Sequence, residues 1–157
     1  ELDYLIDNKV MKSGEYQLPD ALRRMTLSAC VFKPGEVTEW LDCGNKEVTV
    51  HTNKRVLDFD FEKNIPLVHT SSKIINSQII PPCFIGENAR IENSIIGPHV
   101  SVGANTKINS SIIKNTNIQE NTSITNAVIF NSMIGSYVNF NGKANDLSLG
   151  DFSIVNE

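Results

Sequence analysis

The sequence has 157 residues, of which 40% are hydrophobic and 20% charged, and its formal net charge at pH 7 is -4. This composition is typical of one globular domain or two small ones and argues against a disordered chain. The Lys and Arg residues are scattered and are outnumbered by Asp and Glu. The electrostatic field of the protein therefore opposes the binding of nucleic acid. No apolar run approaches the ~18 residues of a membrane span, and residues 1–30 lack the regions of a signal peptide. We therefore expect a cytoplasmic protein with neither nucleic acid nor a membrane as partner.

Residues 1–64 carry alternating helix and strand patterns. The segments "ELDYLIDNKV" (1–10) and "LPDALRRMTLSA" (18–29) space their apolar residues as amphipathic helices do, and the second has a proline in its first turn. The next segment, "ACVFKPGEVTEWLDCG" (29–44), predicts two short strands around a Pro34-Gly35 turn. Asn45 can then cap a third helix. Two strands are too few for a sheet that covers its own faces.

From about residue 74, an internal repeat of 16 to 17 residues replaces the helical pattern. Within each period, apolar residues fall about every five or six positions and are separated by Asn, Gly, Ser and Thr. Such hexads predict a left-handed parallel β-helix with short strands on three faces and one inward aliphatic residue per face. Asparagines then belong at the corners, where stacked amide ladders can form. Three apolar columns recur together: Ile79, Ile96, Ile113 and Ile129; Ile85, Val102, Ile118 and Ile134; and Ile91, Ile108, Ile124 and Phe140.

The two patterns divide the chain into an α+β part, residues 1–64, a linker that leads into the repeat, residues 65–78, and the β-helix, residues 79–157. The last segment, "FNGKANDLSLGDFSIVNE" (140–157), departs from the repeat. Because an end coil exposes unpaired backbone groups, this change of pattern predicts a cap or an interface.

The three cysteines, Cys30, Cys43 and Cys83, are widely separated and odd in number. This spacing fits neither a disulfide framework nor the paired ligands of a zinc knuckle. We interpret them as reduced structural thiols.

The segment "GEYQLPDALRRM" (14–25), followed by "EWLDCGNKEVTVHTNKRVL" (39–57) and a hexapeptide β-helix, resembles the sugar-phosphate nucleotidyltransferases. The resemblance is to the glucose-1-phosphate thymidylyltransferase and NDP-sugar pyrophosphorylase type, in a long form with a β-helix tail, and covers essentially the whole chain. It implies a Mg²⁺-dependent reaction in which a nucleoside triphosphate and a sugar 1-phosphate give an NDP-sugar and pyrophosphate. Glucose 1-phosphate and dTTP are the substrates expected first. The tail then serves assembly or regulation.

The resemblance also implies roles for three residues. Asp42, the aspartate of "WLDCG", matches the second of two aspartates that hold Mg²⁺ against the nucleotide phosphates. Glu15 would shape the sugar end of the pocket, and Trp40 would line it. Pro19 stands where the family often has threonine. Without the resemblance, Asp42 would be interpreted as a turn residue that caps the following helix.

Several family motifs do not occur in this sequence. In the family, a glycine-rich G-x-G-T-R loop with its lysine, the first metal aspartate and an E-K-P sugar-binding segment all lie upstream of the matched motifs. No two glycines of this chain are two positions apart. We therefore expect the chain to be the C-terminal portion of such an enzyme and to be inactive by itself.

Two alternatives remain open. Hexapeptide β-helices also form acyltransferases that use a histidine as general base, and His99 is the only histidine inside the repeat. We expect His99 to be a solvated corner residue, because the short period leaves no room for a cofactor-binding loop between residues 79 and 140; His51 and His69 have no evident partner. The β-helix could instead be a non-catalytic scaffold that assembles a homotrimer or homodimer through residues 79–157.

Overall fold

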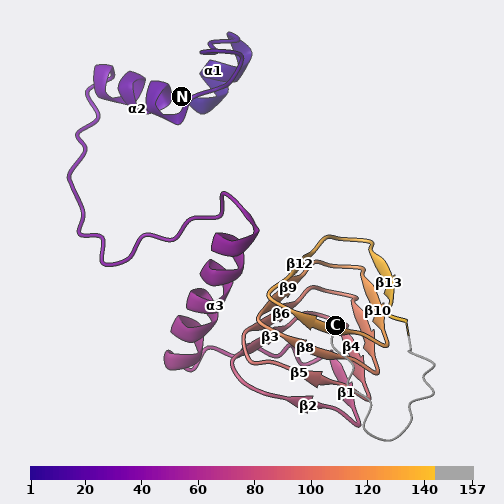
Figure 1. Cartoon of the computed structure of the whole chain (residues 1–157). Helices are drawn as coiled ribbons and strands as arrows, with labels where there is room; N and C mark the ends of the chain where they lie inside the picture. Colours follow the sequence, from indigo (N-terminus) through magenta and orange to yellow (C-terminus); the bar gives the residue numbers. More distant parts are fainter. Residues whose placement is uncertain (144–157) are drawn as a thin grey trace, which may run out of the picture. The chain divides into compact units, whose positions relative to one another are not determined.

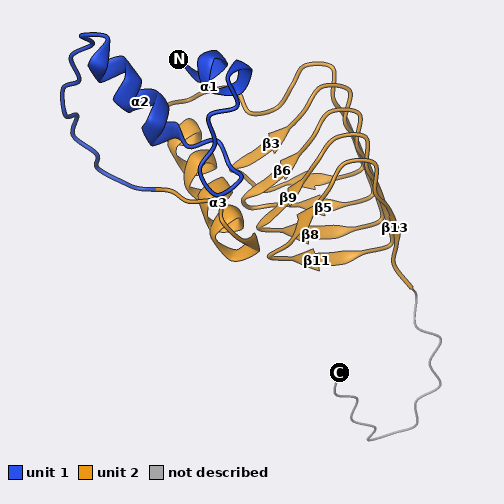
Figure 2. Cartoon of the chain, turned by 90° about the horizontal axis from the view of Figure 1, so that it is seen from above, with its two compact units in different colours: residues 1–40 blue, residues 41–157 orange. Residues whose placement is uncertain are grey.

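The computed structural model describes residues 1–143 and divides the chain into two compact units, Glu1–Trp40 and Leu41–Glu157 (Figure 2). The first unit contains the helices α1 (Leu2–Asp7) and α2 (Leu18–Leu27). The second contains α3 (Lys46–Glu62) and every strand of the described residues (Figure 1). Most of the predicted terminal cap falls outside the described residues. None of the described helices has the length and apolar character needed to cross a membrane.

In the first unit, α1 and α2 confirm the two helices predicted from the apolar spacing. Leu5 and Ala21 are buried between them. The guanidinium of Arg24 lies over the Tyr4 ring, 3.4 Å from its centroid, and Arg24 Nε donates to Glu1 Oε2 at 2.6 Å. Packing and one charged contact therefore hold this small helix pair together.

The prediction of two strands around Pro34-Gly35 is wrong. The segment between α2 and α3 contains no strand, and the side chains of Val31 and Trp40 are each 85% exposed. A strand is stable only when a neighbour accepts its backbone hydrogen bonds, and the described residues provide no neighbour for this segment.

The helix α3 begins as predicted after Asn45. The Asn45 side chain accepts a hydrogen bond from the Val48 backbone N–H at 3.1 Å, which is the usual N-cap contact. Val50 and Leu57, two turns apart, are buried. The helix packs on the β-helix at the strand Thr116–Ile118.

The strands form a left-handed parallel β-helix with three faces (Figure 1). Face I contains β1 (Lys73–Ile75), β4 (Arg90–Glu92), β7 (Lys107–Asn109), β10 (Ser123–Thr125) and β13 (Asn139–Asn141). Face II contains β2 (Gln78–Ile79), β5 (Ile95–Ile96), β8 (Ile112–Lys114) and β11 (Val128–Phe130). Face III contains β3 (Cys83–Ile85), β6 (Val100–Val102), β9 (Thr116–Ile118) and β12 (Met133–Ile134).

The strand registers confirm the three apolar columns. Each predicted neighbour is a direct pair across adjacent strands, as for Ile96 with Ile113 on face II and Ile108 with Ile124 on face I. The inner members are fully buried, whereas Phe140 is 45% exposed in the last described coil. The columns therefore form one continuous core that runs through the stacked coils.

The corners of the β-helix confirm the role predicted for asparagine. Corner residues have positive φ, which Asn adopts more readily than most residues. The three corner columns are Asn76, Asn93, Ser110 and Asn126; Asn88, Asn105, Asn121 and Tyr137; and His99, Asn115 and Asn131. Amide ladders also form, since Asn76 donates to Asn93 and Asn115 donates to Asn131, each at 2.7 Å. The asparagines therefore have a structural explanation.

Candidate functional site

Asp42 lies in the loop directly before α3, with its carboxylate exposed. Its Oδ1 accepts a hydrogen bond from the Cys43 backbone N–H at 2.7 Å. A Cβ at Gly44 would lie 3.4 Å from Asp42 Oδ2, so the carboxylate turns back over its own loop. The backbone carbonyl of Asp42 accepts a hydrogen bond from Thr52 Oγ1 of α3 at 2.5 Å. The loop is therefore fastened to α3, and Asn45 rather than Asp42 caps that helix.

The Asp42 carboxylate can supply one oxygen ligand to a magnesium ion. Oδ2 has no hydrogen-bond partner among the described residues, and Mg²⁺ is commonly held by one or two carboxylates together with substrate phosphates and water. Within residues 1–143, no group of three or more His, Cys, Asp or Glu side chains could hold a metal ion. This part of the chain therefore offers one ligand of such a site and no complete metal centre.

Glu15 and Trp40 belong to the first unit. The backbones of Lys12 and Glu15 exchange two hydrogen bonds across a tight turn, and the Glu15 side chain accepts from Gln17 Nε2 at 3.3 Å. Trp40 is almost fully exposed. Their assignment to a sugar pocket stays a prediction.

His99 is at a corner, as predicted, but its side chain is mostly buried rather than solvated. Its backbone φ is +60°, and its Nε2 lies 2.7 Å from Asp58 Oδ1 of α3. The His99 side chain is only 17% exposed, and Arg55 Nη1 lies 3.7 Å from the other Asp58 oxygen. The sequence alone did not reveal this pair. A signal was nevertheless present, because His99 occupies a corner column that otherwise contains Asn115 and Asn131.

The other two histidines, His51 and His69, have surroundings different from those of His99. His51 is exposed on α3, and His69 Nδ1 lies 2.8 Å from Ser71 Oγ within its own turn. Successive strands from β3 to β13 follow one another without an inserted loop. The expectation that no cofactor-binding loop interrupts the repeat is therefore confirmed for the described coils.

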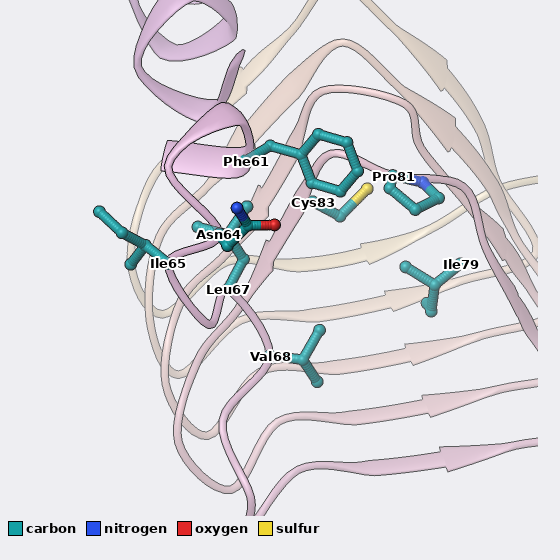
Figure 3. Close-up of a pocket in the computed structure, with 8 residues that line it drawn as sticks. All are labelled: Phe61, Asn64, Ile65, Leu67, Val68, Ile79, Pro81 and Cys83. Carbon is teal, nitrogen blue, oxygen red and sulfur yellow. The ribbon is translucent and has the colours of Figure 1, made fainter. Parts of the chain in front are cut away.

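A hollow of about 280 Å³ lies where the chain passes from α3 into the first coil (Figure 3). The Cys83 thiol in this hollow donates to the Ile80 carbonyl at 3.0 Å, and burial raises its pKa. A high pKa keeps the thiol protonated and unreactive, in agreement with a structural role. No charged side chain of residues 1–143 lines the hollow, so it is poorly suited to phosphorylated substrates. Its lining residues are Phe61, Asn64, Ile65, Leu67, Val68, Ile79, Pro81 and Cys83.

Comparison with protein families finds a match for the β-helix. Residues 65–141 match the family described as GlmU-like, C-terminal hexapeptide. A comparison with curated proteins finds no match. The matched stretch contains all thirteen strands of the described residues, from β1 to β13. Residues 65–141 are therefore a hexapeptide-repeat β-helix similar to the GlmU-like C-terminal hexapeptide family.

Proposed function

We propose that this chain is the C-terminal portion of a sugar-1-phosphate nucleotidyltransferase, in which Asp42 binds Mg²⁺ and the β-helix serves assembly. The observation that carries the proposal is the arrangement of the "WLDCG" loop, which lies directly before α3 and a hexapeptide β-helix with its aspartate exposed. Glucose 1-phosphate and dTTP are the first substrates to test. The metal would neutralise phosphate charge during in-line transfer.

The first test is Asp42→Asn in the longer polypeptide that also carries the upstream family motifs. Asparagine keeps the side-chain size but removes the charge that attracts the metal. We expect pyrophosphate release with Mg²⁺, glucose 1-phosphate and each nucleoside triphosphate to fall by roughly 100-fold or more, which corresponds to about 2.7 kcal/mol of transition-state stabilisation.

A matched control is Asp60→Asn, which removes a half-buried carboxylate from the distal part of α3. This variant should keep the parental rate. Near-parental turnover by Asp42→Asn would show that Asp42 is only a turn residue. Turnover of no triphosphate by the parent would refute the nucleotidyltransferase proposal, and turnover by the isolated 157-residue chain would refute the assignment of the catalytic loop to an upstream segment.

A second candidate function, the assembly of subunits, is favoured by the outer surface of face II. The outward residues Ile95, Ile112 and Val128 are register neighbours and are 39%, 44% and 67% exposed. The outward residues of face I are mainly polar or charged, and face III contacts α3. A contiguous exposed apolar column is typical of a protein–protein contact. A second copy of the chain, as a homodimer or homotrimer, is the proposed partner.

Val128→Asp is expected to weaken this assembly, because it places a charge at the most exposed point of the column. Sedimentation equilibrium at micromolar concentration should show an oligomer for the parent and mainly monomer for the variant. Lys107→Asp, an outward change on face I, should leave the oligomer intact. A monomeric parent would remove the assembly proposal, and loss of the oligomer in both variants would place the contact elsewhere.

A further inference from the structure

Two polar contacts fasten α3 to the β-helix. His99 Nε2 lies 2.7 Å from Asp58 Oδ1, and Ser101 Oγ donates to Asn53 Oδ1 at 2.6 Å. Both β-helix residues belong to the same coil, at the corner before face III and in β6 of that face. Hydrogen bonds that involve a charged group contribute more than neutral ones, so the His99–Asp58 contact is the stronger candidate anchor.

The same helix also holds the loop of the candidate metal ligand. Thr52 Oγ1 donates to the Asp42 backbone carbonyl at 2.5 Å, and Thr52 is adjacent in sequence to Asn53. A continuous series of contacts therefore leads from the β-helix through α3 to the loop of Asp42. Because the backbone of that loop is attached to α3, a change in the position of α3 changes the position of the Asp42 carboxylate.

The corner itself gives no structural reason for a histidine. Asparagine occupies the equivalent corner in the next two coils, at Asn115 and Asn131, and the ladder between them does not extend to His99. Asn115 Oδ1 is buried and has no hydrogen-bond partner within the described residues. An asparagine at position 99 could continue the ladder, which means that the histidine serves α3 rather than the corner.

We propose that His99 is a positioning residue for Asp42, acting through Asp58 and α3. The proposal rests on the nucleotidyltransferase function proposed above. It assigns to the β-helix a part in the geometry of the metal site, in addition to assembly. Ser101 contributes to the same anchor through Asn53.

The anchor can be tested without an activity assay, by measuring amide hydrogen exchange of the 157-residue chain. His99→Asn suits the corner and removes the contact with Asp58. We expect exchange of the α3 amides to become about tenfold faster, while the amides of the inner strands keep their protection. His51→Asn is the matched control, because it changes an exposed histidine of α3 that takes no part in the hydrogen bonds of Asp58, Asn53 and Thr52 described above.

The positioning role is tested in the polypeptide that carries the upstream motifs. His99→Asn should raise the Mg²⁺ concentration for half-maximal rate several-fold and lower kcat, with little change in KM for the sugar phosphate. Thr52→Val, which removes the hydroxyl bound to the Asp42 carbonyl, should have the same effect. Because both variants break one series of contacts, the double variant should be little worse than either single variant.

The outcomes separate this inference from the proposed function. Unchanged exchange of α3 in His99→Asn would overturn the anchor. Faster exchange with an unchanged Mg²⁺ dependence would overturn the positioning role, while loss of activity in Asp42→Asn would still support the nucleotidyltransferase. An inactive parent polypeptide would refute the proposed function, and the positioning role with it.

Discussion

Ile113→Asp is expected to unfold the β-helix. Ile113 is fully buried and pairs with Ile96 and Ile129 in the middle of its column. The substitution removes about 1.5 to 3 kcal/mol of apolar burial and places a carboxylate where no partner can reach it, which costs several kcal/mol more. The total is comparable to the roughly 5 to 15 kcal/mol that stabilises a domain. Far-UV circular dichroism and urea unfolding should show little or no folded β-helix.

The neighbouring residue provides the control. Ile112 lies on the same strand, points outward and is 44% exposed. Ile112→Asp should therefore change the free energy of unfolding by about 1 kcal/mol or less when it is measured at low protein concentration. Ile113→Val should lie between the two, with a loss of about 0.5 to 1.5 kcal/mol. Equal effects of the two aspartates would contradict the inward and outward assignment of this strand.

The β-helix could be predicted almost residue by residue because its information is repeated. A column such as Ile91, Ile108 and Ile124 contains one inward residue from each coil. The period of the repeat alone therefore predicts which residues pair across neighbouring strands. The corner asparagines repeat in the same way. A helix cap also depends only on nearby residues, so the sequence predicts the cap at Asn45 without knowledge of the remaining fold.

Features that depend on distant partners could not be predicted. The segment around Pro34-Gly35 has the residues of a hairpin, but its backbone lacks a neighbouring strand among the described residues. Asp58 and His99 are 41 positions apart, and no periodic pattern connects a helix to a corner. The same limit applies to the candidate site, since the sequence indicated Asp42 but not the hydroxyl of Thr52 that fastens its loop.

Gly97→Ala is expected to be the second most damaging substitution. Gly97 has a φ of +112°, and a Cβ there would lie 2.0 Å from the Ile80 carbonyl oxygen and 2.6 Å from Cys83 Sγ. A side chain in this conformation costs about 1 to 3 kcal/mol, and overpacking a closely packed interior costs about as much again. The backbone cannot easily move away, because Gly97 N–H donates to the Ile113 carbonyl at 2.8 Å. Urea unfolding should therefore show a loss of about 2 to 6 kcal/mol.

Gly135→Ala is the matched control, since this glycine also follows an inward isoleucine but has open space where a Cβ would be added. This variant should change the free energy of unfolding by less than about 1 kcal/mol. The change can be stabilising, because alanine reduces the conformational entropy of the unfolded chain. The comparison separates the combined effect of the positive φ and the close approach between neighbouring coils from the general effect of replacing glycine. If Gly97→Ala were as stable as Gly135→Ala, the chain at this corner could not pass as close to Ile80 and Cys83 as the structure places it.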